Sequence, residues 1–283
     1  MLFDPRFILC TIFISIEITV KCEEPPEPSK ITNGFPAAPS SYPYIVAIMQ
    51  PPEEVGGNAN MYGGGAILSE WWILTARSVI SNSKNLLEGP RKVYIYPKYD
   101  NNLRKIIRNG AKFFKPAKIF CPPHEVTDVL DQQTDLALIK LSEPLPLGLP
   151  PHNFRPVRIA KSTERGQSAR IAGWGRAVRN EPASKMNDLM EAEISLPSFT
   201  ICLPKCKIFT RIKSPIGGYP NPCHGDEGGP AVIRNPHTFE DEVVGVIVYQ
   251  DSYCLMKSIF VNTSTYLPWI NRVMETETAK FEC

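Results

Sequence analysis

The chain has 283 residues, of which 43% are hydrophobic, so it can bury a large core and general disorder is excluded. Its 31 Lys and Arg residues against 29 Asp and Glu residues give a net charge of +2, which provides no argument for a nucleic-acid partner. The 28 prolines favour short strands and turns over long helices.

The first predicted element is a signal peptide over residues 1–22. Arg6 precedes an apolar run from Phe7 to Val20, which Glu17 interrupts. The run is too short to span a bilayer and stands at the amino end, as in a secretory signal; a buried strand is the alternative. No later run is long and apolar enough to cross a membrane. We therefore expect a secreted, extracellular protein without a membrane span.

The next segments predict a leader and then a β-rich domain. Residues 23–30, "EEPPEPSK", are acidic and proline-rich, which is typical of a flexible leader. Over residues 31–275, short runs such as "YPYIVAIM" and "EVVGVIVYQ" alternate with Gly, Pro, Asn and Asp clusters. This spacing predicts an all-β barrel or sandwich. Only the end reads as a helix, with Ser264 or Thr265 as its N-cap, before a tail over residues 276–283.

A basic stretch extends from Leu103 to Lys118 and contains no acidic residue. Its cations are Arg104, Lys105, Arg108, Lys112, Lys115 and Lys118. One interpretation is a binding site for a polyanion such as a sulfated glycan. The other, which we favour, is that these residues form the solvated faces of two strands.

Eight cysteines are typical of a protein that folds in an oxidising compartment. Cys10 lies in the predicted signal, and cleavage after Cys22 would remove two of the eight and leave six, an even number that suits pairing. If Cys22 is retained, seven remain and one is free or intermolecular.

Six segments, in order over about residues 31–274, resemble motifs of the trypsin/chymotrypsin-like serine protease family. They are "SKITNGFPA" at its activation site, "GGGAILSEWWILTARSV" at its "LTAAHC" segment, "TDLALIKL" at its "DIALLKL", "IAGWGR" at its "GWG", "CHGDEGGPAV" at its "CxGDSGGP" and "IFVNTSTYLPWI" at its closing strand and helix. The resemblance implies two antiparallel six-stranded β-barrels, roughly residues 31–155 and 156–262, and a C-terminal helix.

The resemblance also implies that the catalytic triad is degenerate. Ser78 stands at the position of the catalytic histidine, Asp135 at the aspartate and Glu227 at the nucleophilic serine. A serine hydroxyl is no base at neutral pH. The carboxylate of Glu227 would repel the oxyanion that the N–H groups of Gly225 and residue 227 stabilise in the family. We expect no proteolysis; the alternatives are an enzyme with non-standard residues, such as His224 with Glu227, or a decoy for protease inhibitors.

The specificity pocket implied by the resemblance is altered. Asn221 stands at its base, and Gln250 and Ser258 stand where the family has glycines, so their side chains would narrow the pocket. The resemblance also pairs Cys223 with Cys254, beside these positions.

Other cysteine positions differ from the family. Gly63 and Val79 stand where the family has the pair that flanks its histidine, so both partners are absent together. The pairing of the remaining candidates stays open among three connectivities, for Cys121, Cys202, Cys206 and Cys283.

The resemblance places an activation-type cleavage site between Lys30 and Ile31. In the family, the freed amino group pairs with the aspartate before the nucleophile, which is Asp226 here. We expect cleavage after Lys30 to switch binding rather than catalysis; the alternative is inherited sequence without processing.

The remaining expectations concern modification and partners. Asn262 begins an Asn-Thr-Ser glycosylation sequon. We expect no cofactor and no metal site. The function predicted is that of a noncatalytic protease homologue, a cofactor or regulator that binds extracellular proteins, such as a protease or its substrate. Invertebrate immune cascades and reproductive fluid are candidate settings.

Overall fold

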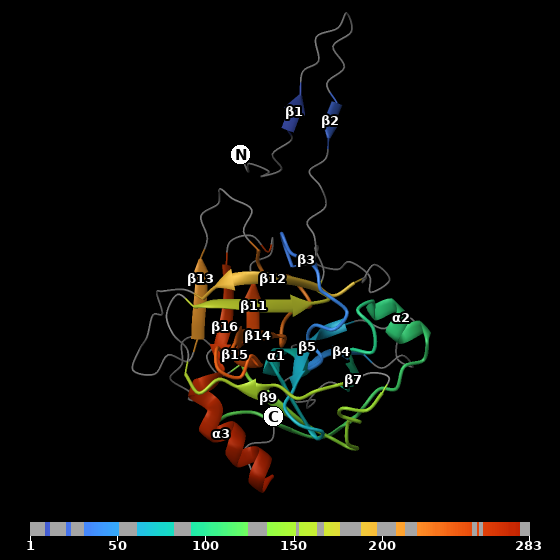
Figure 1. The fold of residues 1–283 in the computed structure, drawn as a ribbon, viewed down its shortest axis with the longest axis vertical. Helices are drawn as coiled ribbons and strands as arrows, with labels where there is room; N and C mark the ends of the chain where they lie inside the picture. The colour runs from blue at the N-terminus through green and yellow to red at the C-terminus, as the bar shows by residue number, and fades with distance from the viewer. Residues whose placement is uncertain are drawn as a thin grey trace, which may run out of the picture.

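The computed structural model describes residues 9–11, 21–23, 31–50, 61–81, 92–123, 135–150, 153–162, 167–175, 188–196, 208–212, 220–250, 254 and 257–277. The predicted all-β fold with a C-terminal helix is confirmed (Figure 1). In chain order the elements are β1 (Leu9–Thr11), β2 (Lys21–Glu23), β3 (Phe35–Pro36), β4 (Ile45–Met49), β5 (Met61–Ile67), β6 (Trp72–Thr75), α1 (Arg77–Ile80), β7 (Tyr94–Pro97), α2 (Leu103–Arg108), β8 (Pro116–Phe120), β9 (Ala137–Leu141), β10 (Arg158–Ile159), β11 (Ser168–Gly173), β12 (Met190–Ser195), β13 (Ile208–Ile212), β14 (Pro230–Arg234), β15 (Asp241–Gln250), β16 (Lys257–Asn262) and α3 (Thr263–Thr276).

The first large sheet has six strands in the order β7-β4-β5-β6-β9-β8, and each neighbouring pair is antiparallel. A bridge between Ile95 in β7 and Phe114, just before β8, connects its two outer strands. Each of these residues donates its N–H to the other's carbonyl at 2.9 Å. The bridge thus closes the sheet into a barrel.

The second large sheet has eight strands, not the six that were expected. Its order is β13-β16-β15-β14-β11-β12-β3, and β10 pairs with β15 in parallel. The additional strands come from connecting segments: β3 follows the start of the domain and pairs with β12, while β10 follows the last strand of the first sheet. β1 and β2 form a separate two-stranded sheet.

The burial patterns explain why these segments form strands. All five residues of β4 are buried, so both of its faces are covered. In β12, buried Ala192 and Ile194 alternate with exposed Glu193 and Ser195, as expected for a strand with one face in water. The C-terminal helix α3 buries Tyr266, among other residues, and contacts β15 and β10.

The prediction that only the C-terminal segment is helical is wrong, because α1 and α2 are short helices. α2 occupies the start of the basic stretch that was predicted to form strands. Leu103 and Ile106, three residues apart, are both buried, and the Asn102 side chain accepts from the Lys105 N–H as an N-cap. Local capping and a 3-residue apolar spacing therefore override the strand prediction here.

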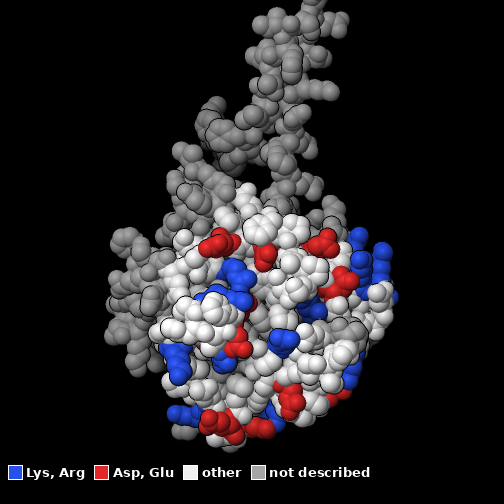
Figure 2. Space-filling view, viewed as in Figure 1, with Lys and Arg blue, Asp and Glu red and all other residues white. Residues whose placement is uncertain are grey.

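Charge is distributed unevenly over the visible surface. Figure 2 shows Lys and Arg side chains gathered at the right edge, where Figure 1 places α2, and both signs interspersed elsewhere. Lys105 and Arg108 of α2 are exposed. Polyanion binding by this stretch, the interpretation that we did not favour, stays untested. Among the described residues no helix is long and apolar enough to cross a membrane.

Candidate functional site

The loop between Cys223 and Gly229 has a fixed shape before β14 begins. The Asp226 N–H donates to the Cys223 carbonyl at 2.9 Å, and the Gly229 N–H donates to the Asp226 carbonyl at 3.0 Å. Gly225 and Gly228 have φ angles of 94° and 80°, which glycine adopts without strain. The motif "GDEGG" therefore folds as a tight turn that presents residues 226 and 227.

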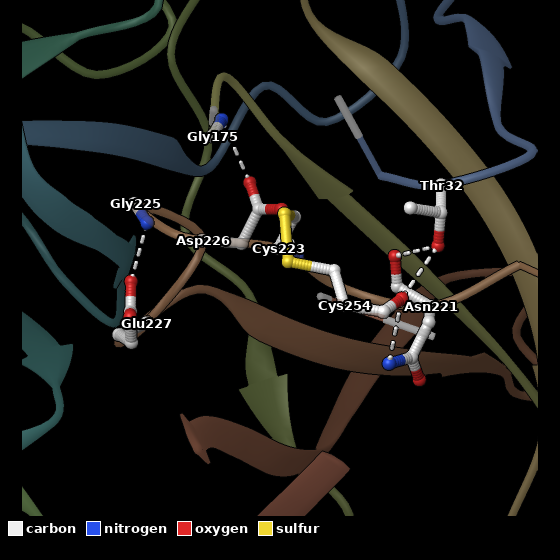
Figure 3. The surroundings of a disulfide bond; sticks show 8 residues. All are labelled: Thr32, Gly175, Asn221, Cys223, Gly225, Asp226, Glu227 and Cys254. Atoms are coloured by element: carbon white, nitrogen blue, oxygen red, sulfur yellow. Dashed lines mark hydrogen bonds between the residues drawn. A yellow bond between two sulfur atoms is a disulfide. The ribbon is translucent and has the colours of Figure 1, made fainter. Parts of the chain in front are cut away.

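Glu227 bends back over this turn and occupies a backbone donor. The Gly225 N–H donates to Oε2 of Glu227 at 2.5 Å (Figure 3). By the family resemblance, this N–H is one of the two that would stabilise an oxyanion. The site therefore already contains a negative group at the place where negative charge would develop during acyl transfer.

Ser78 and Asp135 form the second part of the site. The Ser78 hydroxyl donates to Oδ2 of Asp135 at 2.8 Å, and the Ser78 N–H donates to Oδ1 at 2.7 Å. Asp135 is only 8% exposed, whereas Ser78 is exposed at the start of α1. The group bonded to the Asp135 carboxylate is thus a serine hydroxyl and not an imidazole.

The glycines of β5 bring these two parts together. The Gly64 N–H donates to the Glu227 carbonyl at 2.7 Å. A Cβ on Gly63 would lie 2.3 Å from that carbonyl oxygen and 2.6 Å from Cγ2 of Val79. The structure thus places Glu227 next to the segment that carries Ser78. It also shows that Gly63 and Val79, the positions of the missing cysteine pair, face each other.

Asp226 points to the other side of the turn (Figure 3). It is 1% exposed, and its two oxygens accept from the Gly175 N–H and the Cys223 N–H, each at 2.8 Å. A Cβ on Gly175 would lie 2.5 Å from the Asp226 carboxyl carbon, and one on Gly173 would lie 1.9 Å from Oδ1. The "GWG" motif therefore supplies a cradle that only glycine allows at both ends.

The segment that follows Lys30 is docked beside this cradle. Ile31 is 0% exposed and has a φ of 34°. Thr32 forms a bridge with Asn221, and its hydroxyl donates to the Cys254 carbonyl at 3.0 Å. Lys30 itself lies outside the described residues. An ion pair of the Ile31 amino group with Asp226 requires cleavage and stays a prediction.

Two of the three predicted pocket positions are brought together. The Ser258 hydroxyl donates to Oδ1 of Asn221 at 2.9 Å, and Nδ2 of Asn221 donates to the Cys254 carbonyl at 3.3 Å. Asn221 is 1% exposed and Ser258 is 0% exposed. Gln250 pairs with Ser258 along the backbone, but its side chain lies outside the described residues. The polar groups of Asn221 and Ser258 are thus bonded within the protein.

The predicted disulfide between Cys223 and Cys254 is confirmed, with a Cα–Cα distance of 5.1 Å (Figure 3). Cys121 is disulfide-bonded as well. The other candidates, Cys202, Cys206 and Cys283, lie outside the described residues.

Asn262, the sequon residue, is 7% exposed and its Oδ1 caps α3 by accepting from the Ser264 N–H. Its glycosylation stays a prediction.

The sequence analysis missed one contact at the triad positions: it predicted repulsion by Glu227 but not the bond of Glu227 to the Gly225 N–H. The only signal was spacing, since a glutamate two residues after a glycine can reach back across a tight turn.

Comparisons of the sequence with known proteins identify the family. The family model described as Trypsin matches residues 31–270. Serine protease SP24D of Anopheles gambiae is 25% identical over 256 residues, which cover 87% of this chain and 82% of that protein. Chymotrypsin of Phaedon cochleariae is 26% identical over 252 residues, which cover 85% and 81% of the two chains.

A solved structure supports the fold. Neuropsin, described as a serine protease expressed in the limbic system of mouse brain, matches with a TM-score of 0.62 and 21% identity. The match covers 86% of this chain and 99% of neuropsin. At this level of identity, the likeness shows the fold alone.

Proposed function

Because this chain belongs to the trypsin family, we propose that it is a secreted, catalytically inactive serine protease homologue that binds extracellular proteins as a cofactor or regulator. The contact that supports this most directly is the bond from the Gly225 N–H to the Glu227 carboxylate. Acyl transfer needs a nucleophile, a base and free oxyanion donors. Glu227 takes one donor, and Ser78 replaces the base.

The loss of chemistry is accompanied by retention of the scaffold. The Cys223–Cys254 disulfide, the buried Asp226 and the docked Ile31 are all present. These features order the loops around the former cleft, and ordered loops on a rigid scaffold are suited to recognition. The protein can therefore hold a polypeptide partner, such as a protease or its substrate, without cutting it.

The backbone at Ile31 supports a role for cleavage after Lys30. A positive φ is a genuine outlier for a β-branched residue and costs about 1–3 kcal/mol. Cleavage of the Lys30–Ile31 bond would remove this constraint, because φ is no longer tied to a preceding peptide. The freed amino group would then pair with Asp226 and stabilise the docked segment. Cutting would thus change the order of the binding loops rather than start catalysis.

The test compares the uncut chain, the chain cut after Lys30 and an uncuttable Lys30→Gln variant. We expect none of them to hydrolyse peptide or ester substrates or to react with a fluorophosphonate, a reagent for activated serines. From native extracellular fluid, we expect the cut chain to retain a partner that the Lys30→Gln variant does not. Quantitative mass spectrometry of the retained proteins measures this difference.

Two outcomes would contradict the proposal. Hydrolysis by the wild type that Glu227→Gln abolishes would show that the carboxylate is catalytic; the variant separates this from a contaminating protease. Equal retention of every protein by the cut chain and by Lys30→Gln would eliminate the cleavage switch.

A further inference from the structure

A second candidate site is a cavity of about 640 Å³ that shares no residue with the Glu227 site. We call it the arginine cavity, because its walls include four arginines: Arg155, Arg158, Arg170 and Arg234. Neither the family resemblance nor the proposed function uses any of these four side chains.

The arginine cavity lies at the junction of the two large sheets. Tyr44 and Leu68 adjoin strands of the first sheet, whereas Arg170 and Arg234 belong to β11 and β14 of the second. β14 separates it from the Glu227 site: the strand begins at Pro230, near the Glu227 turn, and ends at Arg234. Four steps along a strand amount to about 13 Å. Junctions between structural units are frequent places for small-ligand sites.

Positive charge exceeds negative charge in this cavity. Its two acidic residues are Glu240 and Asp241. Glu240 pairs with Arg158, and Oδ1 of Asp241 pairs with both Arg170 and Arg234, the latter at 3.3 Å. Among the lining residues, four cations and two anions leave a surplus of two positive charges, and Glu191, which does not line the cavity, is a further anion that acts on Arg170. Each guanidinium has five N–H donors, so the three paired arginines keep further donors for a ligand.

On the inner wall of the arginine cavity, tyrosine side chains contact Asp241 and Arg170. Tyr44 donates its hydroxyl to Oδ2 of Asp241 at 2.7 Å. Burial, together with the negative charge of Asp241, raises the pKa of Tyr44 well above its usual value, so the hydroxyl keeps its proton. The guanidinium of Arg170 lies 5.5 Å from the ring centroid of Tyr42, a cation–π contact. A ligand would thus meet Arg170 in a fixed orientation.

The lining also has an apolar part, next to polar residues such as Ser40 and Ser41. Leu68, Pro156 and Val157 contribute to it, and Phe239 stands at the rim with 68% of its surface exposed. Phe239 is one of three large hydrophobic residues exposed among the described residues. A ligand that covered Phe239 would remove this apolar surface from water.

We propose that the arginine cavity binds a small amphipathic anion, with a sulfate, phosphate or carboxylate head and an aromatic or aliphatic body. The head would accept charge-assisted, bidentate hydrogen bonds from the arginines, chiefly Arg234 and Arg158, whose side chains are 59% and 60% exposed. The body would lie against Phe239 and Val157. Both parts are needed, because the cavity provides both kinds of wall.

The experiment is a titration of the full chain with phenyl sulfate, followed by methyl NMR of Leu68 and Val157. We expect both resonances to shift and saturate. Inorganic sulfate, which has only the head, and benzyl alcohol, which has only an aromatic body, should each bind about tenfold more weakly or worse. Binding of benzyl alcohol with the same affinity as phenyl sulfate would overturn the proposal. The absence of any resonance shift with phenyl sulfate would overturn it as well.

Matched variants assign the head-group contact. Arg234→Gln and Arg158→Gln should each weaken phenyl sulfate binding about tenfold, the usual range for a lost charge-assisted bond. Arg108→Gln on α2 removes the same charge from an exposed residue outside the cavity and should leave the affinity unchanged. Equal weakening in all three variants would show that net charge alone attracts the probe, which would also overturn the proposal.

Discussion

Two adjacent carboxylates, Asp226 and Glu227, have opposite roles because their surroundings differ. Asp226 is buried and accepts two backbone N–H groups, so its charge is compensated and it stabilises the loop. Glu227 is half-buried and accepts from the Gly225 N–H, so this donor is occupied within the protein. The motif predicted both residues and their positions. The motif could not predict the bond from the Gly225 N–H to the Glu227 carboxylate, because that bond depends on the rotamer of a flexible side chain.

The substitution Asp226→Asn tests how much the buried Asp226 carboxylate contributes to stability. One amide oxygen can replace one carboxylate oxygen, but the NH₂ group would face an N–H donor, so a buried donor loses its acceptor. We expect a loss of about 3 kcal/mol in the free energy of unfolding, measured by urea denaturation. Asp188→Asn is the matched control, since Asp188 is exposed and accepts a single bond from Asn102; its cost should be below about 0.5 kcal/mol. Equal costs would show that burial of Asp226 is not important for stability.

At the scale of the elements, the turn before β14 packs closely against β5. Gly228 has a φ of 80°, and a Cβ there would lie 2.3 Å from Oγ1 of Thr75 and 2.4 Å from the Gly64 carbonyl oxygen. Thr75 in turn donates its hydroxyl to that carbonyl at 2.7 Å. The two sheets therefore meet here through the Gly64 backbone and the Thr75 hydroxyl, with no room for a side chain at residue 228.

Gly228→Ala tests this contact, and Gly110→Ala is its control. Both glycines have a positive φ, but a Cβ on Gly110 would meet nothing within 4 Å. Gly110→Ala should cost about 1 kcal/mol from backbone strain alone. Gly228→Ala adds overpacking and should cost about 4 kcal/mol. Thermal unfolding of both variants measures the difference; similar values would show that the turn can move away from β5.

Elements were predicted well where a motif or a clear apolar pattern marked them. The segments "TDLALIKL" and "EVVGVIVYQ" correspond to β9 and β15, and the closing helix corresponds to α3. The additional strands β3 and β10 are only two residues long, which is too short for any periodicity. Their pairing depends on where the connecting segments lie in three dimensions.

For the whole molecule, ionisation of buried tyrosines limits stability at high pH. Burial raises the pKa of Tyr42 far above its usual 10.0. Burial, with the negative charge of Glu143, raises the pKa of Tyr99 to about 12. Burial, with the negative charge of Asp241, also raises the pKa of Tyr44. The folded protein thus holds protons that the unfolded chain would release.

These shifts predict alkaline unfolding. A raised pKa in the folded state contributes stability that is fully present below pH 10.0 and is lost as the pH rises, for Tyr99 through about 12. Ultraviolet titration should show ordinary phenols ionising first and these three ionising late, together with the loss of circular dichroism. Tyr99→Phe should remove one late phenol. Ionisation of all phenols along one unshifted curve in a folded protein would contradict the prediction.

At the molecular scale, motifs predicted the two-unit β architecture and one disulfide, because these depend on local sequence in a fixed order. The arginine cavity could not be predicted. Its lining comes from six separate stretches between Ser40 and Asp241, and only folding brings them together.

The cap of α3 restricts when the sequon at Asn262 could be modified. Asn262 ends β16 and is 7% exposed, and the hydroxyl of its neighbour Thr263 donates to the Val243 carbonyl. An enzyme that attached a sugar to Asn262 would need the tripeptide accessible, so attachment would have to precede the pairing of β16 with β15. Folding and any glycosylation of the sequon would therefore compete for the same three residues, and a chain that folds first would keep Asn262 as the cap of α3.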